Sequence, residues 1–80
     1  MLFLVEYDRQ RGVLISFQSF PQSEQARADS ARLELELRLN REGIGHEVVL
    51  LEAASENALR RSHRRYFEDV AKIAGTTARR

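Results

Sequence analysis

The sequence predicts one small α+β domain whose elements follow the order β-β-α-β-α. Three observations predict this class. Two short segments rich in aromatic and β-branched residues flank a polar turn at Gly12, a pattern typical of a β-hairpin. Residues 24–42 contain no β-branched residue and are rich in Ala, Leu, Glu and Arg, which favours a helix. A short apolar run and a second segment with helical spacing complete the chain.

The first two strands are expected at residues 2–7 and 13–20. Gly12 can adopt the positive φ that closes such a hairpin, and Pro21 ends the second strand because it cannot donate to a β-ladder. Side chains alternate between the two faces of a strand. The residues predicted to share a face are Phe3, Val5 and Tyr7 on the first strand, and Val13, Ile15 and Phe17 on the second.

The first helix is predicted at residues 24–42. Leucines alternate with charged residues from Leu33 to Leu39, which is a strand period, but Leu, Glu and Arg are helix formers and the preceding residues are helical in character. Gly43 stands at the position of a left-handed C-cap, and Ile44 is expected to close a Schellman motif onto Leu39. The predicted N-caps are Ser23, or Ser19 together with Gln22.

Residues 47–51 form a nearly all-apolar run, which predicts a short strand buried on both faces and central in the sheet. A right-handed crossover places this strand parallel to the second, in strand order 2-1-3 or 1-2-3. A second helix is predicted at residues 56–74, capped by Ser55 and stopped by Gly75. We therefore expect a three-stranded mixed sheet with two helices packed on one face.

The expected domain covers residues 1–75, and residues 76–80 form a short polar tail. The chain has no cysteine, which excludes disulfides, thiol catalysis and cysteine-bound metals and fits a cytoplasmic protein. No stretch reaches about 20 apolar residues, so no membrane span is expected. The apolar start at residues 1–5 is cut short by Glu6, unlike a signal peptide. The net charge of +1 combines a mildly acidic body up to Asn57 with a basic C-terminal quarter.

The first helix carries two apolar stripes on nearly opposite sides, whereas a surface helix usually needs only one. The sheet would cover one stripe, and either the second helix or a second copy of the chain would cover the other. We predict self-association through the stripe that faces away from the sheet. The stripe expected to face the sheet is Ala26, Ser30, Leu33 and Leu37, and the candidate oligomer interface is Ala28, Ala31, Leu35 and Leu39.

The second helix carries four arginines on the face opposite its apolar residues. Such a basic patch could contact the phosphates of RNA, DNA or another polyanion, or an acidic protein partner. The alternative is a solvated face neutralised by Glu56, Glu68 and Asp69 and by the acidic body of the same domain. The candidate patch is Arg60, Arg61, Arg64 and Arg65.

No constellation of catalytic residues is recognisable. The two imidazoles are His46, expected to be exposed at the start of a strand, and His63, expected at the edge of the core. Neither belongs to a metal-binding or nucleophile motif, and the small core leaves little room for a concave site. We therefore predict no enzymatic activity, no metal, no cofactor and no small-molecule substrate. A hydrolase would require one of these histidines in a pocket beside a carboxylate.

Residues 3–9 with Gly12, and residues 50–56 leading into residues 63–67, resemble segments of short uncharacterised bacterial proteins. The Leu-Glu-Leu-Glu-Leu helix between them adds to the likeness, which spans most of the chain. The resemblance implies a bacterial, cytoplasmic protein and assigns no residue a role. The sequence as a whole favours a non-catalytic interaction module that forms a homodimer through its first helix, with polyanion binding as the alternative.

Overall fold

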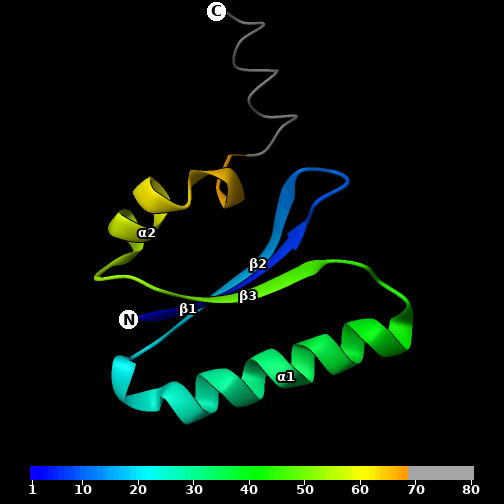
Figure 1. Ribbon diagram of the computed structural model, residues 1–80, viewed down its shortest axis with the longest axis horizontal. Helices are drawn as coiled ribbons and strands as arrows, with labels where there is room; N and C mark the ends of the chain where they lie inside the picture. Colours follow the sequence, from blue (N-terminus) through cyan, green and yellow to red (C-terminus); the bar gives the residue numbers. More distant parts are fainter. Residues whose placement is uncertain (69–80) are drawn as a thin grey trace, which may run out of the picture.

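The computed structural model describes residues 1–68 and confirms the α+β class and the order of the elements. The three strands form one sheet, and Figure 1 shows the helices lying on either side of it. One turn of 3₁₀ helix precedes the first α-helix, and another follows the second. The elements are β1 (Leu2–Asp8), β2 (Val13–Phe20), α1 (Gln25–Glu42), β3 (Glu47–Glu52) and α2 (Glu56–Ser62), with 3₁₀ turns at Gln22–Glu24 and Arg64–Tyr66.

The sheet has the strand order β2-β1-β3, which is one of the two predicted orders. β3 runs parallel to β2 as expected, but β1 lies between them and pairs antiparallel with each. The prediction of a mixed sheet is therefore wrong, because every pair of neighbouring strands is antiparallel. The prediction that residues 47–51 form the central strand is also wrong. β1 is central with all seven residues buried, whereas residues 47–51 are only partly buried on the edge strand β3.

Each face of the sheet has its own apolar cluster and its own helix. α1 covers the face that carries Leu2 and Leu4, and α2 lies on the opposite face (Figure 1). The turn after α2 packs there against Val5 and Tyr7. The prediction that both helices pack on one face is therefore wrong. β1 carries apolar side chains on both of its faces, so both must be covered to remove that surface from water.

A β-bulge in the hairpin changes which residues of β2 face the core. The register of the two strands shifts between Glu6 and Tyr7, and Ile15 is the extra residue. Leu14 therefore joins Phe17 in packing against the second cluster, while Ile15 is 42% exposed. The predicted alternation, with Ile15 on the face of Phe17, is wrong because the extra residue reverses the pattern between the bulge and the turn.

The C-terminal end of α1 confirms the prediction, and its N-terminal end does not. Gly43 has a φ of 68°, and the Ile44 amide donates to the Leu39 carbonyl at 2.9 Å, which completes the Schellman motif. At the other end, a 3₁₀ turn leads from Pro21 into the helix without any side-chain cap. The prediction of a Ser23 cap is therefore wrong.

The second helix begins where predicted and ends much earlier. The Ser55 hydroxyl accepts a hydrogen bond from the Ala58 amide at 3.1 Å, which confirms the predicted N-cap. The helix stops at Ser62, and His63 leaves the helical conformation with φ −127° and ψ 53°. The prediction of one continuous helix is wrong for the described residues. Residues 69–80, which include the predicted helix stop and tail, lie outside the described part of the chain.

No helix within residues 1–68 combines the length and the apolar character needed to cross a lipid bilayer.

Candidate functional site

The four residues predicted as an oligomer interface on α1 face the sheet instead. Two of them are buried, and the other two pack against the first apolar cluster. Two opposite stripes are equivalent on a helical wheel, so only packing onto the sheet decides which one is covered. The opposite stripe faces outward and leaves Leu33 54% and Leu37 50% exposed. The stripe that faces the sheet is therefore Ala28, Ala31, Leu35 and Leu39, and not the stripe predicted for that side.

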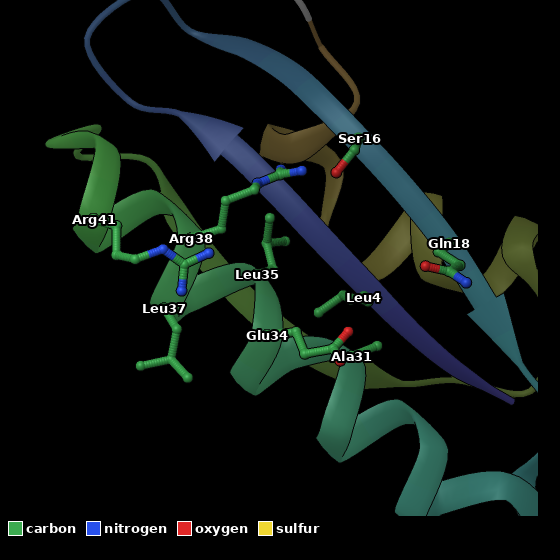
Figure 2. Close-up of a pocket in the computed structure, with 9 residues that line it drawn as sticks. All are labelled: Leu4, Ser16, Gln18, Ala31, Glu34, Leu35, Leu37, Arg38 and Arg41. Atoms are coloured by element: carbon green, nitrogen blue, oxygen red, sulfur yellow. The ribbon is translucent and has the colours of Figure 1, made fainter.

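A groove of about 630 Å³ lies between α1 and the edge strand β2 (Figure 2). Its strand side is polar and its helix side carries two arginines, and Figure 2 shows the Arg38 side chain extending from the helix toward the strands. Neither arginine forms an ion pair with another residue of the described chain. We call this feature the β2 groove and define it by Ser16, Gln18, Glu34, Arg38 and Arg41.

The other edge of the sheet is formed by β3, which has no further neighbouring strand within residues 1–68. Four consecutive apolar residues occupy this strand, and each of them remains partly exposed. Because Glu34 and Arg38 face β2, helix geometry places the opposite flank of α1 on the side of β3. Arg32 and Glu36 lie on that flank and form an ion pair at 3.2 Å. We call Val48, Val49, Leu50 and Leu51 the β3 edge.

Three of the four arginines in the predicted basic patch form ion pairs with carboxylates. Their positive charge is therefore largely neutralised by their own chain, as the alternative interpretation of this patch expected. Arg61 forms no ion pair with another residue among residues 1–68. The three pairs are Arg60 with Glu56 at 2.8 Å, Arg64 with Glu68 at 3.6 Å and Arg65 with Glu47 at 2.9 Å.

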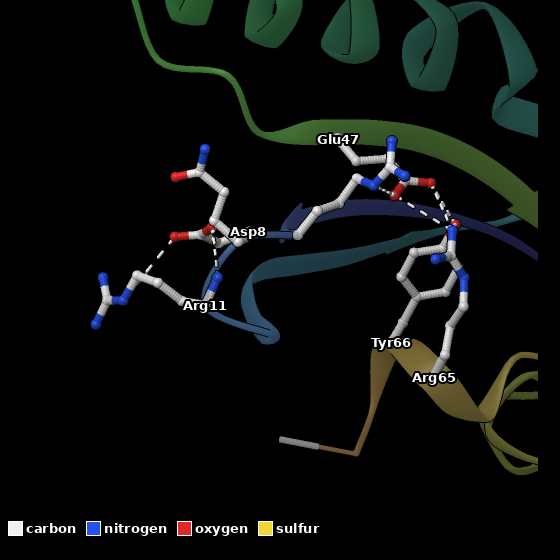
Figure 3. A network of polar contacts seen from close by, with 7 residues as sticks. Asp8, Arg11, Glu47, Arg65 and Tyr66 are labelled. Carbon is white, nitrogen blue, oxygen red and sulfur yellow. Dashed lines mark hydrogen bonds and ion pairs between the residues drawn. The ribbon is translucent and has the colours of Figure 1, made fainter. Parts of the chain in front are cut away.

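Tyr66 anchors the turn after α2 to the second face of the sheet (Figure 3). Its hydroxyl donates to the Glu47 carboxylate at 2.6 Å and accepts from Arg65 at 2.8 Å. Its ring meets Tyr7 edge-on, with the ring centroids 5.2 Å apart. Burial, together with the hydrogen bond to Glu47, raises the pKa of the Tyr66 phenol. Nothing in the sequence indicated this network, because the fold brings its members together from three separate elements.

Replacing Tyr66 with Phe is expected to lower the free energy of unfolding by about 1–2 kcal/mol, because Glu47 and Arg65 lose a hydrogen-bond partner. This loss should shrink at alkaline pH. Because folding raises the pKa of Tyr66, the neutral phenol stabilises the folded wild type at pH values below about 10, the pKa of a tyrosine in the unfolded chain. This contribution is lost as the pH rises through the pKa of the folded state. Urea denaturation of both proteins from about pH 7 to about pH 11 measures the difference. A difference that stays constant over this range would contradict the assigned role.

His46 lies between two carboxylates of β1, so the expectation that it is exposed is wrong. Its Nδ1 is 2.6 Å from Glu6 Oε2, and its Nε2 is 3.6 Å from Asp8 Oδ2. The Ser16 hydroxyl donates to the other Glu6 oxygen at 3.1 Å. A pocket of about 210 Å³ adjoins His46 and Asp8. The buried Glu6 carboxylate thus has one hydrogen-bonding partner on each of its oxygens.

This cluster has the histidine and carboxylate that the hydrolase hypothesis required, but its geometry favours a structural role. Both ring nitrogens of His46 face carboxylates, and the Ser16 hydroxyl bonds to Glu6 and not to the imidazole, so His46 and Ser16 do not form a base–nucleophile pair. His63 lies apart, bonded to Ser62 and stacked on Tyr66. Within residues 1–68 no three side chains are grouped in a way that could hold a metal ion.

Taken together, the fold and these surfaces define a small α+β domain: a three-stranded antiparallel sheet with a helix on each face and, as far as residue 68, open strands at both edges. Comparison with protein families, with curated proteins and with solved structures finds no match to this chain.

Proposed function

We propose that this chain is a non-catalytic interaction module that forms a homodimer through the β3 edge and the adjoining flank of α1. The observation that carries the proposal is the position of four consecutive apolar residues on an open edge strand. Such a run is typical of a strand that is covered on both faces, yet these residues are only partly buried. On an exposed edge the run invites pairing with another strand, and a second copy would bury more of these side chains.

Antiparallel self-pairing of β3 fits the sequence of the strand. Val48 and Leu50 lie on the face of the first cluster, and Val49 and Leu51 lie on the face of the second. Two paired copies would therefore extend both clusters across the interface. Glu47 and Glu52 begin and end the strand, and their side chains point to opposite faces. Residues that lie directly opposite each other in a ladder share a face, so Glu47 of one copy cannot lie opposite Glu52 of the other in any register.

The flank of α1 above this edge is also self-complementary. A two-fold axis that pairs the β3 strands antiparallel brings the two α1 helices together in antiparallel orientation on the same face. Arg32 of one copy then approaches Glu36 of the other, and the reverse pair forms at the same time. One paired strand is small against the roughly 1,600 Å² of a standard interface, so the helix contact is needed for stability.

The proposed dimer is tested by light scattering coupled to gel filtration at micromolar protein concentration. Val49→Lys places a charge on the β3 edge, and Glu36→Arg creates a cluster of like charges between the helices. Each substitution is expected to weaken dimerisation about tenfold or more. The double substitution Arg32→Glu/Glu36→Arg restores the complementary pairs and is expected to recover the dimer.

The matched control is Ile15→Lys, which makes a comparable change at the exposed bulge of β2, on the far edge of the sheet. It is expected to leave the dimer intact. A wild-type chain that stays monomeric at these concentrations, or a dimer that is equally sensitive to Ile15→Lys, would overturn the proposal. Polyanion binding is less well supported, since carboxylates of the same chain neutralise most of the arginine patch.

A further inference from the structure

We infer that the β2 groove binds an extended peptide segment with alternating acidic and apolar residues, which adds to β2 as a further strand. This goes beyond the proposed dimer, because it concerns the opposite edge of the sheet. In a dimer paired through β3, both copies of β2 remain at the outer ends of the joint sheet. Each copy would therefore keep its own groove.

The open edge of β2 provides the backbone recognition. β2 is eight residues long and, within residues 1–68, pairs with β1 on one side and with no strand on the other. The backbone groups on its outer side point away from the sheet and can hydrogen-bond with an added strand. Main-chain pairing of this kind supplies affinity, and pockets for alternate side chains supply specificity. The groove adjoins this edge along Ser16 and Gln18, so an added strand would lie beside it.

The charges of the groove select the acidic residues of the peptide. Arg38 and Arg41 lie on the helix wall beside one acidic residue, Glu34, and all three are exposed, so this wall carries a net positive charge. Other arginines on surface positions of α1 have carboxylate partners within the chain, as Arg27 does with Glu24. The two groove arginines have none among the described residues, so a carboxylate of the peptide would form charge-assisted hydrogen bonds without displacing an existing pair.

The opposite face of β2 selects the apolar residues. Successive side chains of an added strand point alternately toward the two faces of the sheet. On the face away from α1, β2 carries Phe17, which is partly buried, stacks on Phe3 and meets Phe67 edge-on. Apolar side chains of the peptide would extend this aromatic cluster. A strand that alternates Glu and Val therefore satisfies both faces at once.

The probe for this inference is a fluorescein-labelled peptide with the sequence Thr-Glu-Val-Glu-Val-Glu-Thr, titrated with the full chain and followed by fluorescence anisotropy. We expect saturable binding that is weakened about tenfold or more by Arg38→Glu/Arg41→Glu. Both positions are exposed on α1, so the variant is expected to keep the fold. The matched control is Arg61→Glu/Arg64→Glu, which makes the same change of charge at two exposed positions on the opposite face of the sheet and is expected to bind normally.

Two further peptides separate strand addition from simple charge attraction. A peptide with Lys in place of Glu is expected not to bind. A peptide methylated on alternate backbone nitrogens keeps its charges but cannot pair along one edge, and it is also expected not to bind. Equal binding of the methylated peptide, or binding that both double variants weaken equally, would overturn the inference. Since the dimer is tested at β3, these outcomes are independent of the oligomeric state.

Discussion

Replacing Phe3 with Ala is expected to lower the free energy of unfolding by about 3–5 kcal/mol. Phe3 is 1% exposed on the central strand, and its ring stacks on Phe17 with the centroids 5.5 Å apart. Phe17 in turn meets Phe67 edge-on at 5.4 Å, so the substitution removes one end of a chain of three aromatic rings. A domain of this size has a total stability of only about 4–12 kcal/mol. The substitution is therefore expected to remove a large part of the stability of the domain.

Urea denaturation followed by circular dichroism measures this effect, at a fixed protein concentration because dimerisation would add to the apparent stability. The control is Ile15→Ala, which shortens a side chain on the neighbouring strand that is 42% exposed. Its effect is expected to stay within about 0.5 kcal/mol. A loss for Phe3→Ala as small as that of the control would show that Phe3 does not belong to the core.

Replacing His46 with Ala is expected to cost about 3 kcal/mol, because it leaves a buried carboxylate without its partner. The Glu6 side chain is 5% exposed, and the contact between its Oε2 and His46 Nδ1 is 2.6 Å. Ser16 continues to satisfy Oε1, so the cost arises at the other oxygen. The substitution also releases the segment that leads from α1 into β3, because His46 ties this segment to β1.

Two other variants distinguish the loss of the hydrogen-bonding partner of Glu6 from the loss of a histidine side chain as such. His63→Ala removes the second histidine, whose side chain contacts Ser62 and Tyr66, and it is expected to cost less than about 1 kcal/mol. The double substitution Glu6→Leu/His46→Leu removes the buried charge together with its partner, and it is expected to be much less destabilising than His46→Ala. If the double variant were the less stable of the two, the contact between His46 and Glu6 would stabilise the fold more than a well-packed apolar pair does.

Local signals in the sequence predicted the elements that depend on them. The Gly12 turn, the Schellman motif at Gly43 and the Ser55 cap all confirm the prediction, because each depends on contacts within a few residues. The helical composition of α1 outweighed the alternating leucines for the same reason. The second helix was predicted too long, because turning Tyr66 onto the sheet next to Tyr7 requires the chain to leave the helix.

The candidate surfaces could be predicted only in part. The helical spacing of the apolar residues identified two stripes on α1. The prediction assigned the wrong stripe to the sheet, because two opposite stripes are equivalent until one of them packs on the sheet. The arginine patch was visible in the sequence, whereas Glu47, which neutralises part of it, comes from a strand that is distant in the chain. The pairing of His46 with Glu6 spans 40 residues and had no local signal.

The sequence by itself determined the α+β class, the order of the elements, the hairpin turn, the C-terminal end of the first helix and the start of the second, because propensities, caps and turns act over short distances along the chain. Only the tertiary structure decided that β1 is the central strand, that the two helices cover opposite faces and that an apolar strand stands at the edge. These features depend on which surfaces exclude water from one another, and that is a property of the assembled sheet.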